Sequence, residues 1–87
     1  MKPEHEEAVK GSDKDVLLLG DSSWKPVERS LKYAWPDKNG KRARGGEIPL
    51  SAVPQAVLFA ARQGYLEPKQ MATIIKGLAD LLAKKDQ

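Results

Sequence analysis

The sequence predicts an α+β protein, in which a short strand and a basic β-hairpin precede a C-terminal two-helix hairpin. In the first half of the chain, apolar residues come in short runs between turn-forming residues, which is typical of strands. After Ser51 they recur at intervals of three and four, which is typical of amphipathic helices. The chain has 87 residues, which is enough for one small domain with a modest core.

The chain begins with a polar stretch, residues 1–15, which we expect to be a flexible tail. Residues 16–87 are expected to form a single small domain, with a β-rich basic part at 16–50 and a helical part at 51–87. Its first element is the apolar run at residues 16–19. The length of this run and the turn residues that close it predict a buried strand.

Residues 24–35 fit two patterns. As a helix, they place four apolar side chains on one stripe; as a strand, their second half alternates aromatic and polar or small residues. The pair Asn39-Gly40 favours the strand, because it accepts positive φ at both central positions of a type I′ turn. We therefore predict a hairpin of residues 31–38 with 41–46.

Two helices are predicted after this hairpin. Ser51 can cap a well-buried helix over residues 52–63, and Gly64 suits the position just after its end. Pro68 then suits the first position of a second helix. The second helix has the most regular apolar stripe of the chain, made of Met71, Ile74, Ile75, Leu78, Leu81 and Leu82.

The helical part also resembles a helix-turn-helix unit over residues 55–74, because Ala60 and Gly64 have the four-residue separation of that unit. Gln70 stands where the unit has an apolar residue. We assign no base-reading residue from this resemblance. A plain helical hairpin explains the same pattern.

Several function classes are excluded or disfavoured. The chain has no Cys, which excludes thiolate metal sites, disulfides and a thiol nucleophile. Its single histidine, His5, lies in the polar stretch, and no nucleophile elbow or Walker lysine is present. We expect no enzyme, no metal and no cofactor. The longest apolar run, residues 56–61, is too short for a membrane span, and no signal peptide precedes the domain, so we expect a cytoplasmic protein with no membrane partner.

Positive charge concentrates in the predicted hairpin. The net charge is +3, and residues 22–46 carry seven basic and two acidic side chains. In the predicted register Lys38 faces Lys41, and Trp35 faces Arg44, which places arginine beside an aromatic ring. We expect a small regulatory or accessory protein that binds nucleic acid, DNA rather than RNA. The candidate contact residues, with Arg42 and Arg44 as base readers, are Lys32, Trp35, Lys38, Lys41, Arg42 and Arg44.

Two alternatives stay open. Aromatic side chains in so small a chain are more often core anchors than base-stacking platforms, and this holds for Trp24, Tyr33 and Trp35. The stripe of the last helix is either monomer core or an interface with a second copy or a protein partner. If the stripe is an interface, the protein has an alternative function, as an adaptor or inhibitor that does not bind nucleic acid. Its candidate residues are Ile74, Leu78, Leu81 and Leu82.

Overall fold

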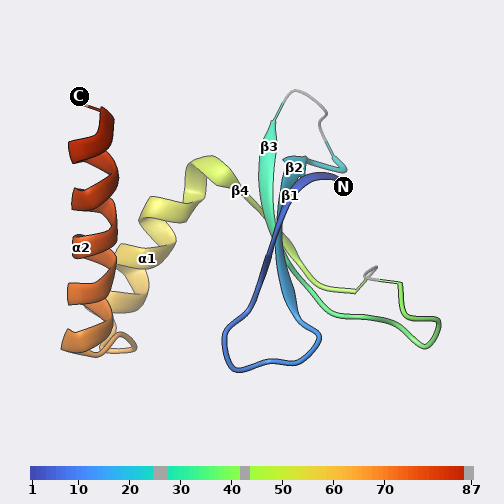
Figure 1. Ribbon diagram of the computed structural model, residues 1–87, viewed down its shortest axis with the longest axis horizontal. Coiled ribbons are helices and arrows are strands. Elements are labelled where there is room, and N and C mark those ends of the chain that lie inside the picture. The colour runs from blue at the N-terminus through green and yellow to red at the C-terminus, as the bar shows by residue number, and fades with distance from the viewer. Residues whose placement is uncertain (25–27, 42–43, 86–87) are drawn as a thin grey trace. The chain divides into compact units, whose positions relative to one another are not determined.

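A computed structural model describes residues 1–24, 28–41 and 44–85 of the chain. The chain has the predicted α+β architecture, with a four-stranded antiparallel sheet followed by two helices (Figure 1). It divides into two compact units, Met1–Val53 and Pro54–Gln87. This differs from the single domain predicted over residues 16–87, whose β-rich and helical parts were expected to meet at residues 50 and 51.

The sheet is a meander in which strands adjacent in sequence are also neighbours in space. Its order is β1-β2-β3-β4, and every neighbouring pair is antiparallel. The strands are β1 (Lys2–Ala8), β2 (Val16–Asp21), β3 (Arg29–Ala34) and β4 (Glu47–Pro49).

The prediction of a flexible tail over residues 1–15 is wrong for β1. This strand pairs with β2 along its length, with Ala8 opposite Val16 and Lys2 opposite Asp21. All its side chains are exposed, so the residues have no apolar alternation by which a sequence pattern could reveal the strand. Backbone hydrogen bonds hold β1, and its charged side chains suit an edge strand because they discourage further pairing.

The predicted buried strand is confirmed as β2. Val16 and Leu18 are buried, and with Ala34 of β3 they form the hydrophobic core of this unit, against which Met1 packs. Leu17 and Leu19 alternate with them on the other face and are partly covered. The alternation follows from the two-residue period of a strand.

Residues 29–34 are a strand, so the helix alternative for this stretch is wrong. β3 pairs with β2 on one side and with β4 on the other, so strands on both sides take up its backbone hydrogen bonds. Residues 25–27 lie outside the described residues.

The turn after β3 differs from the predicted two-residue turn. The Asp37 N–H donates to the Lys41 carbonyl (2.7 Å), and the Gly40 N–H donates to the Asp37 carbonyl (3.1 Å), so three residues form the loop. Among these, Gly40 has positive φ and Asn39 does not. The Asp37 carboxylate explains why the loop has three residues, because its Oδ1 accepts the N–H groups of Asn39 (2.8 Å) and Lys41 (3.0 Å). Lys38 therefore lies inside the loop and does not face Lys41.

The predicted register is confirmed at Trp35 and Arg44 but is wrong at the turn, where Asp37 bonds to Lys41, and the second strand lies later than predicted. Trp35 pairs with Arg44 as a single bridge, and the regular pairing resumes at β4, outside the predicted range 41–46. Ser30 lies opposite Pro49, which is the register that the Trp35–Arg44 bridge sets. The ladder is interrupted between the bridge and β4, where the chain passes through two glycines that have no side chains to pack.

The helical unit contains α1 (Val53–Arg62) and α2 (Pro68–Lys85). A 3₁₀ turn, η1 (Leu50–Ala52), leads into α1, so the predicted cap at Ser51 is wrong because the chain is already helical there. The end of α1 is as predicted. Gly64 (φ 81°) follows it, and the N–H groups of Gly64 and Tyr65 donate to the carbonyls of Ala61 and Ala60 in a Schellman motif.

The start of α2 is also as predicted, with Pro68 as its first residue. The Glu67 N–H donates to Oε1 of Gln70 (2.9 Å), which satisfies one amide before the helix. Within the helical unit no residue of α1 is buried and Leu58 and Phe59 are exposed, so α2 does not bury the apolar face of α1 that was expected to be buried. Each helix of this unit has only the other helix beside it within the unit, and one neighbouring helix buries little of an apolar face.

Candidate nucleic-acid interface

Two aromatic side chains stand together at the end of β3. Tyr33 and Trp35 are 42% and 41% exposed, with ring centroids 6.2 Å apart and planes tilted by 58°. The interpretation of these two side chains as core anchors is therefore wrong, and so is that of Trp24, which is 48% exposed. Strand alternation explains this, because Ala34 points to the opposite face and fills the core in their place.

Partly covered leucines continue the same face of the sheet. Leu17 lies opposite Tyr33, and Leu19 lies opposite Leu31, so all four side chains leave the sheet on the side of Trp35. We call this side, made of Leu17, Leu19, Leu31, Tyr33 and Trp35, the aromatic face. An open depression of about 210 Å³ adjoins it, lined by His5, Glu6, Glu7, Leu17, Leu19 and Leu31.

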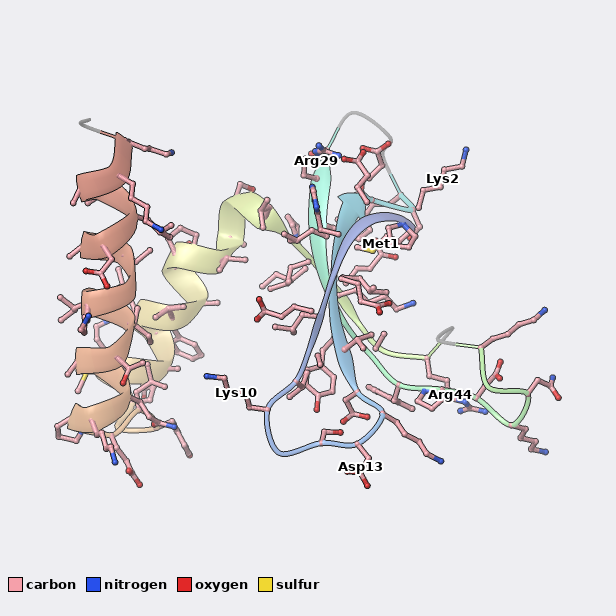
Figure 2. The ribbon with its side chains drawn as sticks, viewed as in Figure 1. Met1, Lys2, Lys10, Asp13, Arg29 and Arg44 are labelled. Carbon is pink, nitrogen blue, oxygen red and sulfur yellow. The ribbon has the colours of Figure 1, made fainter. Side chains whose placement is uncertain are left out.

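Arg44 joins the aromatic face from the other side of the hairpin. The Trp35 N–H donates to the Arg44 carbonyl (3.2 Å), and residues directly opposite each other in an antiparallel pair project to the same face. Figure 2 shows Arg44 on the connection between β3 and β4. The hairpin thus places Arg44, which is exposed, directly opposite the exposed Trp35 on the same face.

The cations of the hairpin have no acidic partners in the described part of the chain. Lys38, Lys41 and Arg44 are exposed, and no carboxylate lies within ion-pair distance of them among these residues. Arg29, at the other end of β3, shows the contrast: its Nη1 lies 2.6 Å from Glu4 Oε1 and 3.3 Å from Asp21 Oδ1. The hydrogen bond to Glu4 raises the pKa of Arg29. Positive charge is therefore neutralised at one end of β3 and left available at the other.

An acidic residue outside the predicted site holds one of the aromatic rings. The Tyr33 hydroxyl donates to Asp15 Oδ2 (2.6 Å), and this hydrogen bond raises the pKa of Tyr33. Asp15 lies just before β2, at a position that becomes close to Tyr33 only through the pairing of β2 with β3. No spacing in the sequence indicates this contact.

The loop between β1 and β2 also reaches the hairpin. An open depression of about 420 Å³ is lined by residues from both segments, which are Asp13, Lys14, Pro36, Asp37, Lys38 and Gly40. Figure 2 marks Asp13 and Lys10 on the first of these loops. Lys14 thereby joins Lys38 as a second cation at this end of the sheet. Sequence reasoning missed Lys14 because it placed the residue in a flexible tail.

Two predicted contact residues do not join this group. Lys32 is partly covered and lies opposite Glu47 and Leu18, on the face of the sheet away from Trp35. Arg42 lies outside the described residues. The predicted residues that the structure does bring together at the hairpin are Trp35, Lys38, Lys41 and Arg44.

Glu47 lies opposite Lys32, on the face of the sheet away from Trp35, and it is a further residue that sequence reasoning missed. Its Oε2 accepts the Ser23 hydroxyl (2.6 Å), and its Oε1 accepts the Ser30 hydroxyl (2.9 Å) and the Ser23 N–H (3.2 Å). The Ser23 hydroxyl, more than any other group, lowers the pKa of this carboxyl. The carboxylate links the segment after β2, the fully buried Ser30 of β3 and the start of β4.

The predicted interface residues of α2 are exposed. Leu78 is 57% exposed, and Ile74, Leu81 and Leu82 are also exposed; no residue of α2 is buried. Neither helix in the described ranges is both long enough and apolar enough to cross a bilayer. Within those ranges no three His, Asp or Glu side chains gather as they would around a metal ion.

The fold and the site together define an α+β protein with an exposed aromatic and basic hairpin. Comparisons with protein-family models, with curated proteins and with solved structures find no match to this chain.

Proposed function

We propose that this protein binds nucleic acid through the hairpin of residues 35–46, as a small regulatory or accessory protein, with DNA as the ligand to test first. The observation that carries the proposal is the set of exposed cations, Lys38, Lys41 and Arg44, beside the exposed ring of Trp35. Phosphates supply the negative charge that such a group attracts, and bases supply faces for the ring.

The charge pattern supports a binding surface over a merely solvated turn. Arg29 is matched with two carboxylates, whereas the hairpin cations have none among the described residues. The one acidic residue of the hairpin, Asp37, uses Oδ1 to accept two backbone N–H groups of the turn. A phosphate that approaches the hairpin therefore meets three exposed positive charges at its tip and base.

The test is fluorescence anisotropy of a labelled random-sequence duplex, titrated with the protein at about 50 and 200 mM salt. If the four cations at residues 38–44 each neutralise one phosphate, log K against log[salt] slopes at about −3.6, a loss of affinity of about 150-fold between these salt concentrations. Removing two of them, in Lys38→Ala with Lys41→Ala, leaves a slope of about −1.8 and a loss of about 12-fold.

The matched control removes the same charge elsewhere. Lys84→Ala with Lys85→Ala takes two cations from the last turn of α2 and should keep the slope of the unchanged protein. Absence of duplex binding at the lower salt, together with absence of binding to single strands, contradicts the proposal. An equal loss of slope in the control contradicts the assignment to the hairpin, because it shows attraction by net charge alone.

A second function, an adaptor or inhibitor that binds another protein through α2, is favoured by one observation. The stripe of Ile74, Leu78, Leu81 and Leu82 is exposed along the helix. An amphipathic helix with an uncovered apolar stripe is a common mode of docking into a groove. Under this function the hairpin variants above leave partner binding unchanged.

A further inference from the structure

The two aromatic rings are placed in a way that distinguishes between kinds of nucleic acid. Tyr33 and Trp35 are two positions apart on a strand, so they project to the same face, and their ring centroids are 6.2 Å apart. Both residues are about two-fifths exposed at the open end of the aromatic face. Each therefore offers a flat apolar surface to a ligand.

Paired and stacked bases cannot use these surfaces. Neighbouring bases in a duplex strand are stacked about 3.4 Å apart, which leaves their flat faces covered by each other and only their edges open in the grooves. The ring planes of Tyr33 and Trp35 are tilted by 58° to each other, so two bases that lie flat on them are not parallel as stacked neighbours are. Two rings in this arrangement suit bases that have left the stack, and an unpaired strand supplies such bases without the cost of opening a duplex.

The charges around the rings favour one orientation of a bound nucleic-acid strand. The Asp15 carboxylate accepts the Tyr33 hydroxyl (2.6 Å), so negative charge stands on the β2 side of the aromatic pair and repels phosphates there. The cations stand on the hairpin side, with Arg44 opposite Trp35 and with Lys38 and Lys41 beyond it. Bases are thereby favoured over the rings and phosphates along the hairpin.

We propose, building on the function proposed above, that the aromatic face binds an unpaired nucleic-acid strand. Two bases stack on Tyr33 and Trp35, and the phosphates follow Arg44, Lys41 and Lys38 toward the loop. This chemistry is shared by single-stranded DNA and RNA. It predicts that unpaired strands bind more tightly than the same sequence in a duplex.

The first measurement compares one labelled mixed-sequence DNA oligonucleotide of about 12 nucleotides, within the range of known single-strand sites, alone and annealed to its complement. An RNA oligonucleotide of the same sequence separates the two sources of unpaired strand. Trp35→Ala should weaken single-strand binding by about 5- to 150-fold, the range for loss of one base–aromatic stack, and Trp35→Phe should restore most of it. The salt dependence should be unchanged in both variants, because no cation is removed.

Further variants and a spectroscopic measurement control for misfolding and for the general loss of an aromatic side chain. Tyr65→Ala removes a more exposed aromatic ring from the helical unit and should leave binding unchanged. In Trp24→Phe, Trp35 is the one remaining tryptophan, so its fluorescence reports directly on stacking and should be quenched by the single strand. Circular dichroism of each variant establishes that the fold is retained.

The outcomes separate this inference from the function on which it rests. Tighter single-strand binding that depends on an aromatic residue at position 35 supports both. Equal or tighter binding of the duplex, with no effect of Trp35→Ala and no quenching, overturns the single-strand assignment and leaves the phosphate-binding hairpin standing. Absence of binding to DNA and RNA in either form overturns both.

Discussion

Replacing Gly45 with alanine tests how the base of the hairpin is held. Gly45 has a φ of 121°, and a Cβ added there would collide with the Tyr33 carbonyl oxygen and lie 3.1 Å from the Ala34 Cα. Both neighbours are backbone atoms at the end of β3, which also pairs with β2. The strand cannot move away without disturbing the Trp35–Arg44 bridge or its pairing with β2.

The expected cost combines two effects. A residue held in a backbone region that only glycine adopts readily costs about 1–3 kcal/mol, and the collision with backbone adds to this. We expect Gly45→Ala to lower the free energy of unfolding of the sheet unit by about 3 kcal/mol. For a unit of this size that is a large share of the total stability, and it lowers Tm by at least about 10 °C. The same change should weaken single-strand binding, because it displaces Trp35 and Arg44.

Gly46 provides the matched control for this experiment. It has no positive φ, and a Cβ added there meets no atom within 4 Å. Gly46→Ala should change stability by no more than about 0.5 kcal/mol. Urea and thermal unfolding followed by circular dichroism and by tryptophan fluorescence measure both variants. Equal stability of Gly45→Ala and Gly46→Ala would refute the argument, because it would show that the two backbones do not approach each other here.

Three further predictions concern the rest of the chain. Ser23 lowers the pKa of Glu47, so the ionised carboxylate stabilises the sheet unit fully above its unfolded pKa near 4.5, and that contribution is lost as pH falls through the lower folded pKa. Urea unfolding across the acid range should show a shallower pH dependence in Glu47→Gln, and an unchanged one counts against this role. Gly64→Ala should destabilise the end of α1 by about 1 kcal/mol, because Gly64 has a positive φ. Gly77→Ala, inside α2 with open space around it, should instead increase helicity in far-ultraviolet circular dichroism. A loss of helicity in both variants contradicts the Schellman motif. Leu78→Lys should retain the helical spectrum because Leu78 is 57% exposed, and sedimentation shows whether it disrupts self-association; global unfolding contradicts the exposed position.

Local patterns predicted the elements whose signals lie within a few residues of one another. The end of α1 just before Gly64 and the start of α2 at Pro68 follow from backbone preferences of single residues, so the sequence predicted them directly. The strand at Val16 followed from a short apolar run. The Trp35–Arg44 pairing was predicted through the Asn39-Gly40 signal, although an Asp37 side chain made the loop one residue longer than expected.

Tertiary structure decided what depends on partners distant in the chain. β1 has no apolar period, so only its pairing with β2 makes it a strand. The rings of Tyr33 and Trp35 are exposed because the small Ala34 between them takes the core position, a choice that the packing of β2 against β3 makes. For the same reason Lys14 reaches the hairpin and Asp15 reaches the Tyr33 hydroxyl. The sequence alone therefore determined the basic charge of the hairpin and the helices after it, because these depend on composition and on neighbours along the chain. Which side chains share the aromatic face was decided by strand pairing, because a face is a property of the sheet and not of any one segment.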